Sequence, residues 1–146
     1  MTGNRMNAHF KTILVGYDGS QTSENALEMG LSIASALDSK VEVLSVVQPP
    51  EPATSVELHA VIDSAKQHYE KALSRVADAA NGNGIKIETN IVVGHPAEQI
   101  IKRAEQSHAD LIVLGRRGIS KFEKLVMGSI SERVLTYAPC PVLVTK

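Results

Sequence analysis

Apolar positions along the chain follow two patterns: short continuous runs, and stripes with a spacing of three and four residues. Runs rich in β-branched side chains predict buried strands at residues 12–17, 41–47, 111–114 and 141–145. In residues 85–93, apolar side chains alternate with mostly polar ones, which is typical of an edge strand with one exposed face. The pattern therefore predicts five strands.

Helical spacing fills four of the stretches between these runs. The first helix begins at Ser20 or Thr22, and we expect it to end at residues 38–40. The other three begin at residues 54–55, at residue 96 and at residues 128–129, and reach about residues 81, 104 and 137. A long loop, residues 115–127, precedes the last helix.

This alternation of strands and helices predicts a parallel sheet with helices on both faces, a Rossmann-like α/β fold. Right-handed crossovers with the first strand in the centre favour the spatial strand order 3-2-1-4-5. No repeat or linker divides the sequence. We therefore expect one domain over residues 11–146 after a flexible tail of residues 1–10.

Composition argues against several classes of function. A formal net charge of -1 gives no basic footprint for nucleic acid or for an anionic membrane surface. No apolar run approaches the roughly 20 residues of a membrane helix, and the polar start lacks the apolar core of a secretory signal. Cys140 is the only cysteine, which fits a reducing compartment. We expect a cytoplasmic protein that binds neither nucleic acid nor membrane.

Candidate binding chemistry lies where the winding of the predicted sheet reverses, between the first and fourth strands. Ligands of such sheets bind beyond the carboxyl ends of the strands at that point. The turn with Asp18 and the loop from Gly115 meet there. Gly115 and Gly118 let the backbone approach a ligand, and the helix from Gly128 presents unpaired N–H groups suited to phosphate. A surface loop with a glycine turn and solvated charges explains the same residues equally well.

Other catalytic and metal-binding signatures are weak. The sequence contains neither a GxxxxGK[ST] phosphate loop nor a GxSxG nucleophile elbow. His59 and His68 are nine residues apart on the long helix and so point to opposite faces, which argues against a metal pair. His95 precedes a helix and is more typical of a turn residue than of a catalyst. Cys140 lies between two prolines, and we expect it to be a small buried side chain.

Five segments, KTILVGYDGS, VGHPAEQI, ADLIVLGRRG, VMGSISERVL and CPVLVTK, resemble the ATP-binding universal stress proteins. The spacing Gly115-x2-Gly118-x9-Gly128-Ser129 is similar to the nucleotide-binding loop of that family. The resemblance covers residues 10–146 and implies an adenine nucleotide alpha hydrolase-like fold that binds ATP or another adenine nucleotide. It also implies a homodimer through the strand that begins at Pro141 and ends at Lys146.

The resemblance also implies roles for single residues. Asp18 would bond the ribose, and Val46 or Val47 would line the adenine pocket. Gly115 and Gly118 would approach the ribose and phosphates. The complete set expected to bind the nucleotide is Tyr17, Asp18, Val46, Val47, Leu114, Gly115, Arg116, Gly118, Gly128, Ser129, Ile130 and Ser131. A divalent ion such as Mg or Mn would sit on the phosphates, since the loop offers no acidic cluster.

These residues leave several functions open. The leading hypothesis is an ATP-binding stress-response or signalling protein. A slow ATP hydrolase is the second, although the loop supplies phosphate clamps without an obvious base. A dimeric interaction module that needs no nucleotide is the third, and cyclic AMP is an alternative ligand for the same pocket.

Overall fold

The computed structural model describes residues 10–49, 55–116 and 128–146. The flexible tail expected over residues 1–10 lies outside this part of the chain except for Phe10, and so does Thr54, the earlier of the two starts expected for the second helix. The elements in chain order are β1 (Thr12–Gly16), α2 (Gln21–Leu37), β2 (Lys40–Val47), α3 (Ser55–Gly82), β3 (Ile87–Val93), α4 (Pro96–Ser107), β4 (Leu111–Gly115), α5 (Ser129–Tyr137) and β5 (Val142–Thr145).

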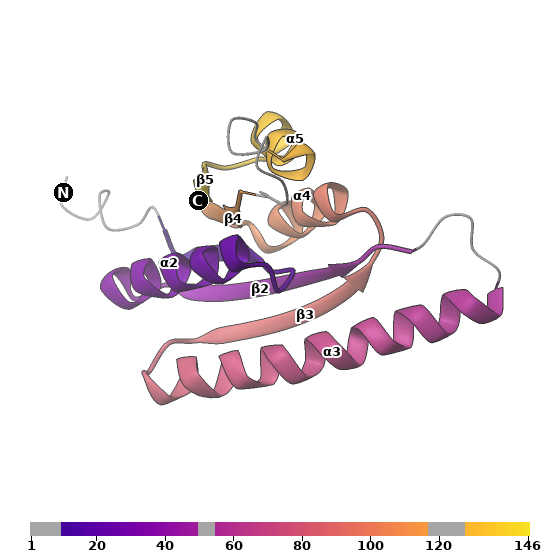
Figure 1. Cartoon of the computed structure of the whole chain (residues 1–146). Helices are drawn as coiled ribbons and strands as arrows, with labels where there is room; N and C mark the ends of the chain where they lie inside the picture. The colour runs from indigo at the N-terminus through magenta and orange to yellow at the C-terminus, as the bar shows by residue number, and fades with distance from the viewer. Residues whose placement is uncertain (1–9, 50–54, 117–127) are drawn as a thin grey trace.

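The five strands form one parallel sheet in the order β3-β2-β1-β4-β5, which confirms the predicted topology. Helices α2 and α3 pack on one face of the sheet, and α4 and α5 pack on the other (Figure 1). In β1, Ile13 and Val15 face the first helix pair and Leu14 faces the second. All three are fully buried, because the central strand of a parallel sheet is covered on both faces.

The ends of α2 follow from local chemistry. Ser20 is the N-cap, and its hydroxyl oxygen accepts a hydrogen bond from the Ser23 N–H at 3.2 Å. At the other end Asp38 adopts a left-handed conformation (φ 56°), and its N–H donates to the Ala34 carbonyl. The helix therefore begins at Gln21, between the two starts that the sequence allowed.

Two expectations about burial differ from the structure. The edge strand β3 is half-buried from Ile87 to Val92 on both faces, because α3 packs on one side and charged partners cover part of the other. It also begins two residues later than the pattern indicated. Cys140 is half-buried at the margin of the α4/α5 core, and burial raises the pKa of its thiol.

A charged cluster joins β2, β3 and α4. Glu42 is 3% exposed, and its carboxylate accepts a hydrogen bond from the Arg103 Nε at 2.8 Å. Arg103 also reaches Glu88 at 3.2 Å, and the Lys40 ammonium lies 2.8 Å from the same carboxylate. The Lys40 hydrogen bond is the main reason that the pKa of Glu88 is lowered. This cluster anchors α4 to the sheet, because the buried Glu42 charge requires a cationic partner.

No helix in the described ranges carries a stretch long and apolar enough to cross a membrane.

Candidate functional site

A cavity of about 270 Å³ opens at the carboxyl edge of the sheet. It spans the reversal between β1 and β4, where the sequence analysis placed a ligand. The described residues that line it come from strand ends and from all four helices: Gly16, Tyr17, Asp18, Ser20, Thr22, Ser23, Leu44, Val46, Val47, Gln48, Val61, Ala65, Tyr69, Pro96, Ile100, Leu114, Gly115, Ile130 and Ser131. Asp18 carries the only charge among them.

Hydrogen bonds between side chains and the backbone hold the turn after β1 in place. The Asp18 carboxylate accepts the Ser20 N–H at 2.9 Å, and the Ser23 hydroxyl lies 3.3 Å from the Asp18 N–H. The buried Ser45 hydroxyl donates to the Tyr17 carbonyl at 2.7 Å, which ties the turn to β2. These bonds hold Asp18 at the mouth of the cavity, and its side chain remains exposed.

Tyr17 lies under this turn with its side chain 7% exposed. Its hydroxyl donates to the Glu24 carboxylate at 2.5 Å. Burial, followed by the hydrogen bond to Glu24, raises the pKa of Tyr17 to about 12. Tyr17 is therefore a neutral phenol near neutral pH, and it lines the cavity.

The end of β4 packs directly against the first turn of α2. A Cβ atom on Gly115 would lie 2.4 Å from the Thr22 carbonyl carbon and 2.5 Å from the Ser23 nitrogen. From the sequence, Gly115 is expected to let the backbone approach a ligand. The structure supplies another reason, since no larger residue fits between this strand end and the helix.

The N-terminus of α5 also borders the cavity, next to the end of β4. Its N-cap is Gly128, which has no side chain to satisfy the first N–H groups of the helix. Ile130 and Ser131 in the first turn line the cavity, and the Ser131 hydroxyl donates to the Gly115 carbonyl at 3.2 Å. The helix thus directs the positive end of its dipole toward the cavity, which favours an anionic group there.

Helix α3 forms one wall of the cavity, which the sequence did not predict. Val61, Ala65 and Tyr69 line the cavity, and the Tyr69 hydroxyl lies 3.5 Å from the Asp18 carbonyl. Ala65 and Tyr69 lie on the apolar stripe that defines the helix in the sequence. The stripe predicts a packed face, but no local signal indicates that these turns face a cavity.

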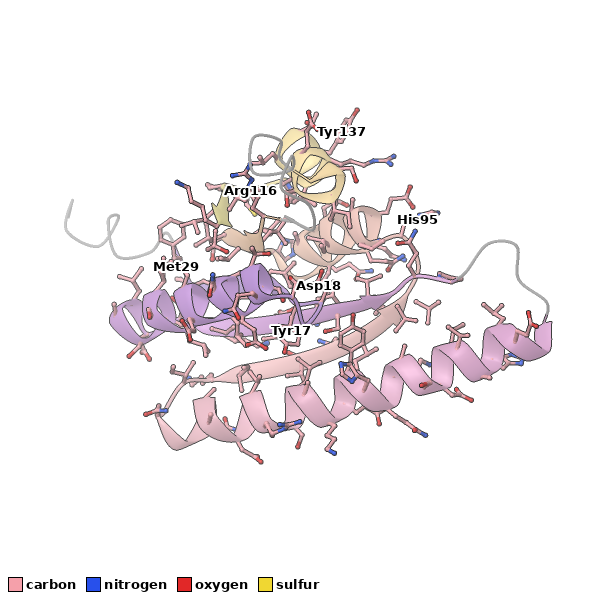
Figure 2. The ribbon with its side chains drawn as sticks, viewed as in Figure 1. Tyr17, Asp18, Met29, His95, Arg116 and Tyr137 are labelled. Atoms are coloured by element: carbon pink, nitrogen blue, oxygen red, sulfur yellow. The ribbon has the colours of Figure 1, made fainter. Side chains whose placement is uncertain are left out.

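Of the twelve predicted site residues, eight lie together on the cavity: Tyr17, Asp18, Val46, Val47, Leu114, Gly115, Ile130 and Ser131. Gly128, Ser129 and Arg116 are chain neighbours of these residues but do not line the cavity. Figure 2 shows Tyr17 and Asp18 close together, and Arg116 farther away toward α5. Gly118 lies outside the described residues, as do the loop cations Arg117, Lys121 and Lys124. The binding role of all twelve residues stays a prediction.

Within the described ranges, no three His, Cys, Asp or Glu side chains gather as metal ligands. His95 is exposed at the N-cap of α4, and its side chain makes no capping hydrogen bond.

The sheet order and the cavity at its reversal place the protein in the class of doubly wound α/β proteins with a cavity at the carboxyl edge of the sheet. The model of the universal stress protein family matches residues 9–146. A universal stress protein of Methanocaldococcus jannaschii is 37% identical over 142 residues, which cover 94% of this chain and 82% of that protein. The chain belongs to the universal stress protein family.

Solved structures agree with this assignment. The universal stress protein UspA from Lactobacillus plantarum superposes with a TM-score of 0.87 at 27% identity, over 95% of this chain and 99% of that one. A universal stress protein crystallised in complex with cyclic AMP superposes with a TM-score of 0.65, also at 27% identity, over 94% of this chain and 98% of its own.

Proposed function

We propose that the protein binds an adenine nucleotide, with ATP as the first candidate, in the cavity at the carboxyl edge, and that it acts in a stress response or in signalling. The observation that carries the proposal is the mixed lining of this cavity. Apolar side chains from β2, α3 and α4 line it together with Asp18 and the first turn of α5.

This mixed lining offers a suitable partner for each of the three parts of a nucleotide. Val46, Val61 and Ile100 offer an apolar surface for the flat base. The Asp18 carboxylate accepts hydrogen bonds and repels phosphate, so it suits the ribose hydroxyls. The first turn of α5 suits the phosphates, because its N–H groups and dipole attract anions. A Mg or Mn ion would then arrive on the phosphates.

Cyclic AMP is the second candidate ligand. It is supported by the relative that was crystallised in complex with cyclic AMP and that spans nearly the same length of chain. Both ligands share the base and the ribose, so they require the same apolar wall. They differ in the phosphates that the α5 end of the cavity would receive.

Calorimetric titration tests the proposal. Protein freed of carried-over ligand by unfolding and refolding is titrated with ATP, AMP, cyclic AMP and GTP. Asp18→Asn keeps the oxygen that accepts the Ser20 N–H but removes the charge, and we expect affinity for the favoured adenine nucleotide to fall about tenfold or more. Asp78→Asn, an exposed position on α3 away from the cavity, is the matched control. Failure of the unaltered protein to bind any of these nucleotides would overturn the proposal.

A homodimer through β5, in the cytoplasm, is a further part of the proposal. Within the described residues, β5 lies at the edge of the sheet and pairs with β4 alone. The N–H groups of Ile112 in β4 and of Arg116 just after it donate to the carbonyls of Pro141 and Thr145, so by strand alternation the Val144 N–H faces the open edge. Beside this edge lies Met29 of α2, whose side chain is 43% exposed (Figure 2). The open edge and the apolar side chain next to it suit pairing with a second copy.

Sedimentation velocity across micromolar concentrations tests the dimer. Val144→Pro removes one outward N–H without removing a bond to β4, so we expect it to weaken the dimer and leave the fold intact. A wild-type protein that sediments as a monomer throughout would contradict the dimer without affecting the nucleotide proposal.

A further inference from the structure

Thr145, in the last strand, joins two elements that are far apart in the sequence. Its hydroxyl lies 3.0 Å from the carbonyl oxygen of Thr22, in the first turn of α2. The same hydroxyl lies 3.3 Å from the carbonyl oxygen of Leu114, in β4. A hydroxyl has one hydrogen to donate, so the two acceptors share it, and the shorter contact is the one to α2.

Two more contacts hold the first turns of α2 at the same place. The Asn25 amide donates to the Lys146 carbonyl at 2.8 Å. The Gly115 backbone lies so close to Thr22 and Ser23 that a Cβ atom would not fit between them. The start of α2 is therefore clamped against the ends of β4 and β5.

The clamped turn is also a wall of the cavity. Thr22 and Ser23 line the cavity from α2, and Leu114 and Gly115 line it from β4, whereas Thr145 itself does not. The Ser23 hydroxyl in turn contacts the Asp18 N–H at 3.3 Å. A shift of the first turn of α2 would therefore move Thr22 and Ser23, which line the cavity, and also the turn that carries Asp18.

We propose that Thr145 is a positioning residue of the nucleotide site: its hydroxyl bonds α2 to the end of β4 and so sets the geometry of the cavity that it does not touch. This inference rests on the proposed nucleotide-binding function. It makes the last strand part of the binding apparatus, in addition to its place in the sheet.

Thr145→Val is the informative substitution because it keeps the β-branched shape and replaces the hydroxyl with a methyl group. A methyl carbon normally stays about 3.3–3.6 Å or more from a carbonyl oxygen, so it cannot occupy the 3.0 Å position beside Thr22. The first turn of α2 must then move outward by a few tenths of an ångström or lose its contact. We expect nucleotide affinity to fall about five- to tenfold, the effect of one lost hydrogen bond.

Two further variants separate positioning from general stability. Thr145→Ser restores the hydroxyl and should recover wild-type affinity within about twofold. Thr89→Val makes the same chemical change on β3, where the threonine is half-buried and its hydroxyl makes no hydrogen bond within the described part of the chain. This control should leave affinity unchanged.

The experiment combines calorimetry with ATP and residue-resolved amide exchange on the free, full-length protein. In Thr145→Val, the Ser23 and Glu24 amides should exchange several-fold faster, while the Arg116 amide, bonded to the Thr145 carbonyl, should keep its protection. Unchanged affinity, or a loss of affinity that Thr145→Ser does not recover, would overturn the inference. If the wild-type protein binds no nucleotide, the proposed function fails and the positioning role in binding fails with it. The exchange rates then still decide separately whether Thr145 holds the start of α2.

Discussion

Replacing Gly115 with alanine should strain the contact between the end of β4 and the start of α2. The new Cβ atom would lie 2.4 Å from the Thr22 carbonyl carbon, 2.5 Å from the Thr22 oxygen and 2.5 Å from the Ser23 nitrogen. All three are backbone atoms, so no side-chain rotation can relieve the overlap. Since carbon contacts are comfortable at roughly 3.5 Å, the first turn of α2 has to move by about 1 Å.

The free energy of unfolding measures this strain. Forcing extra atoms into a packed contact costs about 1–3 kcal/mol, and the immobile backbone places Gly115→Ala near the upper end. Removing a strand glycine returns about 0.5–1 kcal/mol through the unfolded chain. The net loss should be about 2 kcal/mol, which lowers the melting temperature of a domain of this size by roughly 4–8 °C.

Urea unfolding followed by far-ultraviolet circular dichroism provides the measurement. Gly82→Ala is the matched control, because Gly82 ends α3 and a Cβ there meets nothing within 4 Å. We expect this control to be neutral or to gain up to about 1 kcal/mol. If Gly115→Ala unfolded within about 0.5 kcal/mol of the wild type, the close approach of β4 to α2 would be refuted as a constraint on residue 115.

Two other predictions concern ionisable groups. The pKa of Tyr17 is about 12 in the folded protein, compared with the ordinary value of 10.0 that applies to the unfolded chain. The neutral phenol therefore stabilises the fold below pH 10, and this contribution is lost as the pH rises through 12. Between pH 9 and 11 the wild type should lose about 1 kcal/mol more than Tyr17→Phe in urea unfolding, and equal losses would contradict the assignment. Arg103→Met removes the 2.8 Å partner of the buried Glu42 carboxylate and should cost about 2–3 kcal/mol. Adding Glu42→Gln should recover part of that loss, and no recovery would mean that the buried charge is not its cause.

Much of the fold could be predicted from the sequence, because its elements depend on local patterns. The continuous apolar run of β1 predicts a strand buried on both faces, and Ile13, Leu14 and Val15 are fully buried. Right-handed crossovers with the first strand in the centre favoured the strand order 3-2-1-4-5, and the sheet has this order. The half-buried outer face of β3 was not predicted, because it depends on Arg103, which comes from a helix later in the chain.

The candidate site was predictable where it depends on strand ends. Asp18 follows β1 and Gly115 is the last residue of β4, and parallel strands bring their carboxyl ends to one edge of the sheet. The contribution of α3 was not predictable. An apolar stripe such as that of Ala65 and Tyr69 has the same spacing whether it packs on a sheet or borders a cavity.

By itself, the sequence determined the elements, their order along the chain, the turn that carries Asp18 and the helix start at Gly128, since these depend on neighbours within a few residues. Only the tertiary structure decided what lies next to what. It set Gly115 against α2, and it brought the Thr145 hydroxyl to a carbonyl 123 residues earlier in the chain. Such contacts leave no local pattern, because their geometry exists only after the sheet has assembled and placed α2 beside β4 and β5.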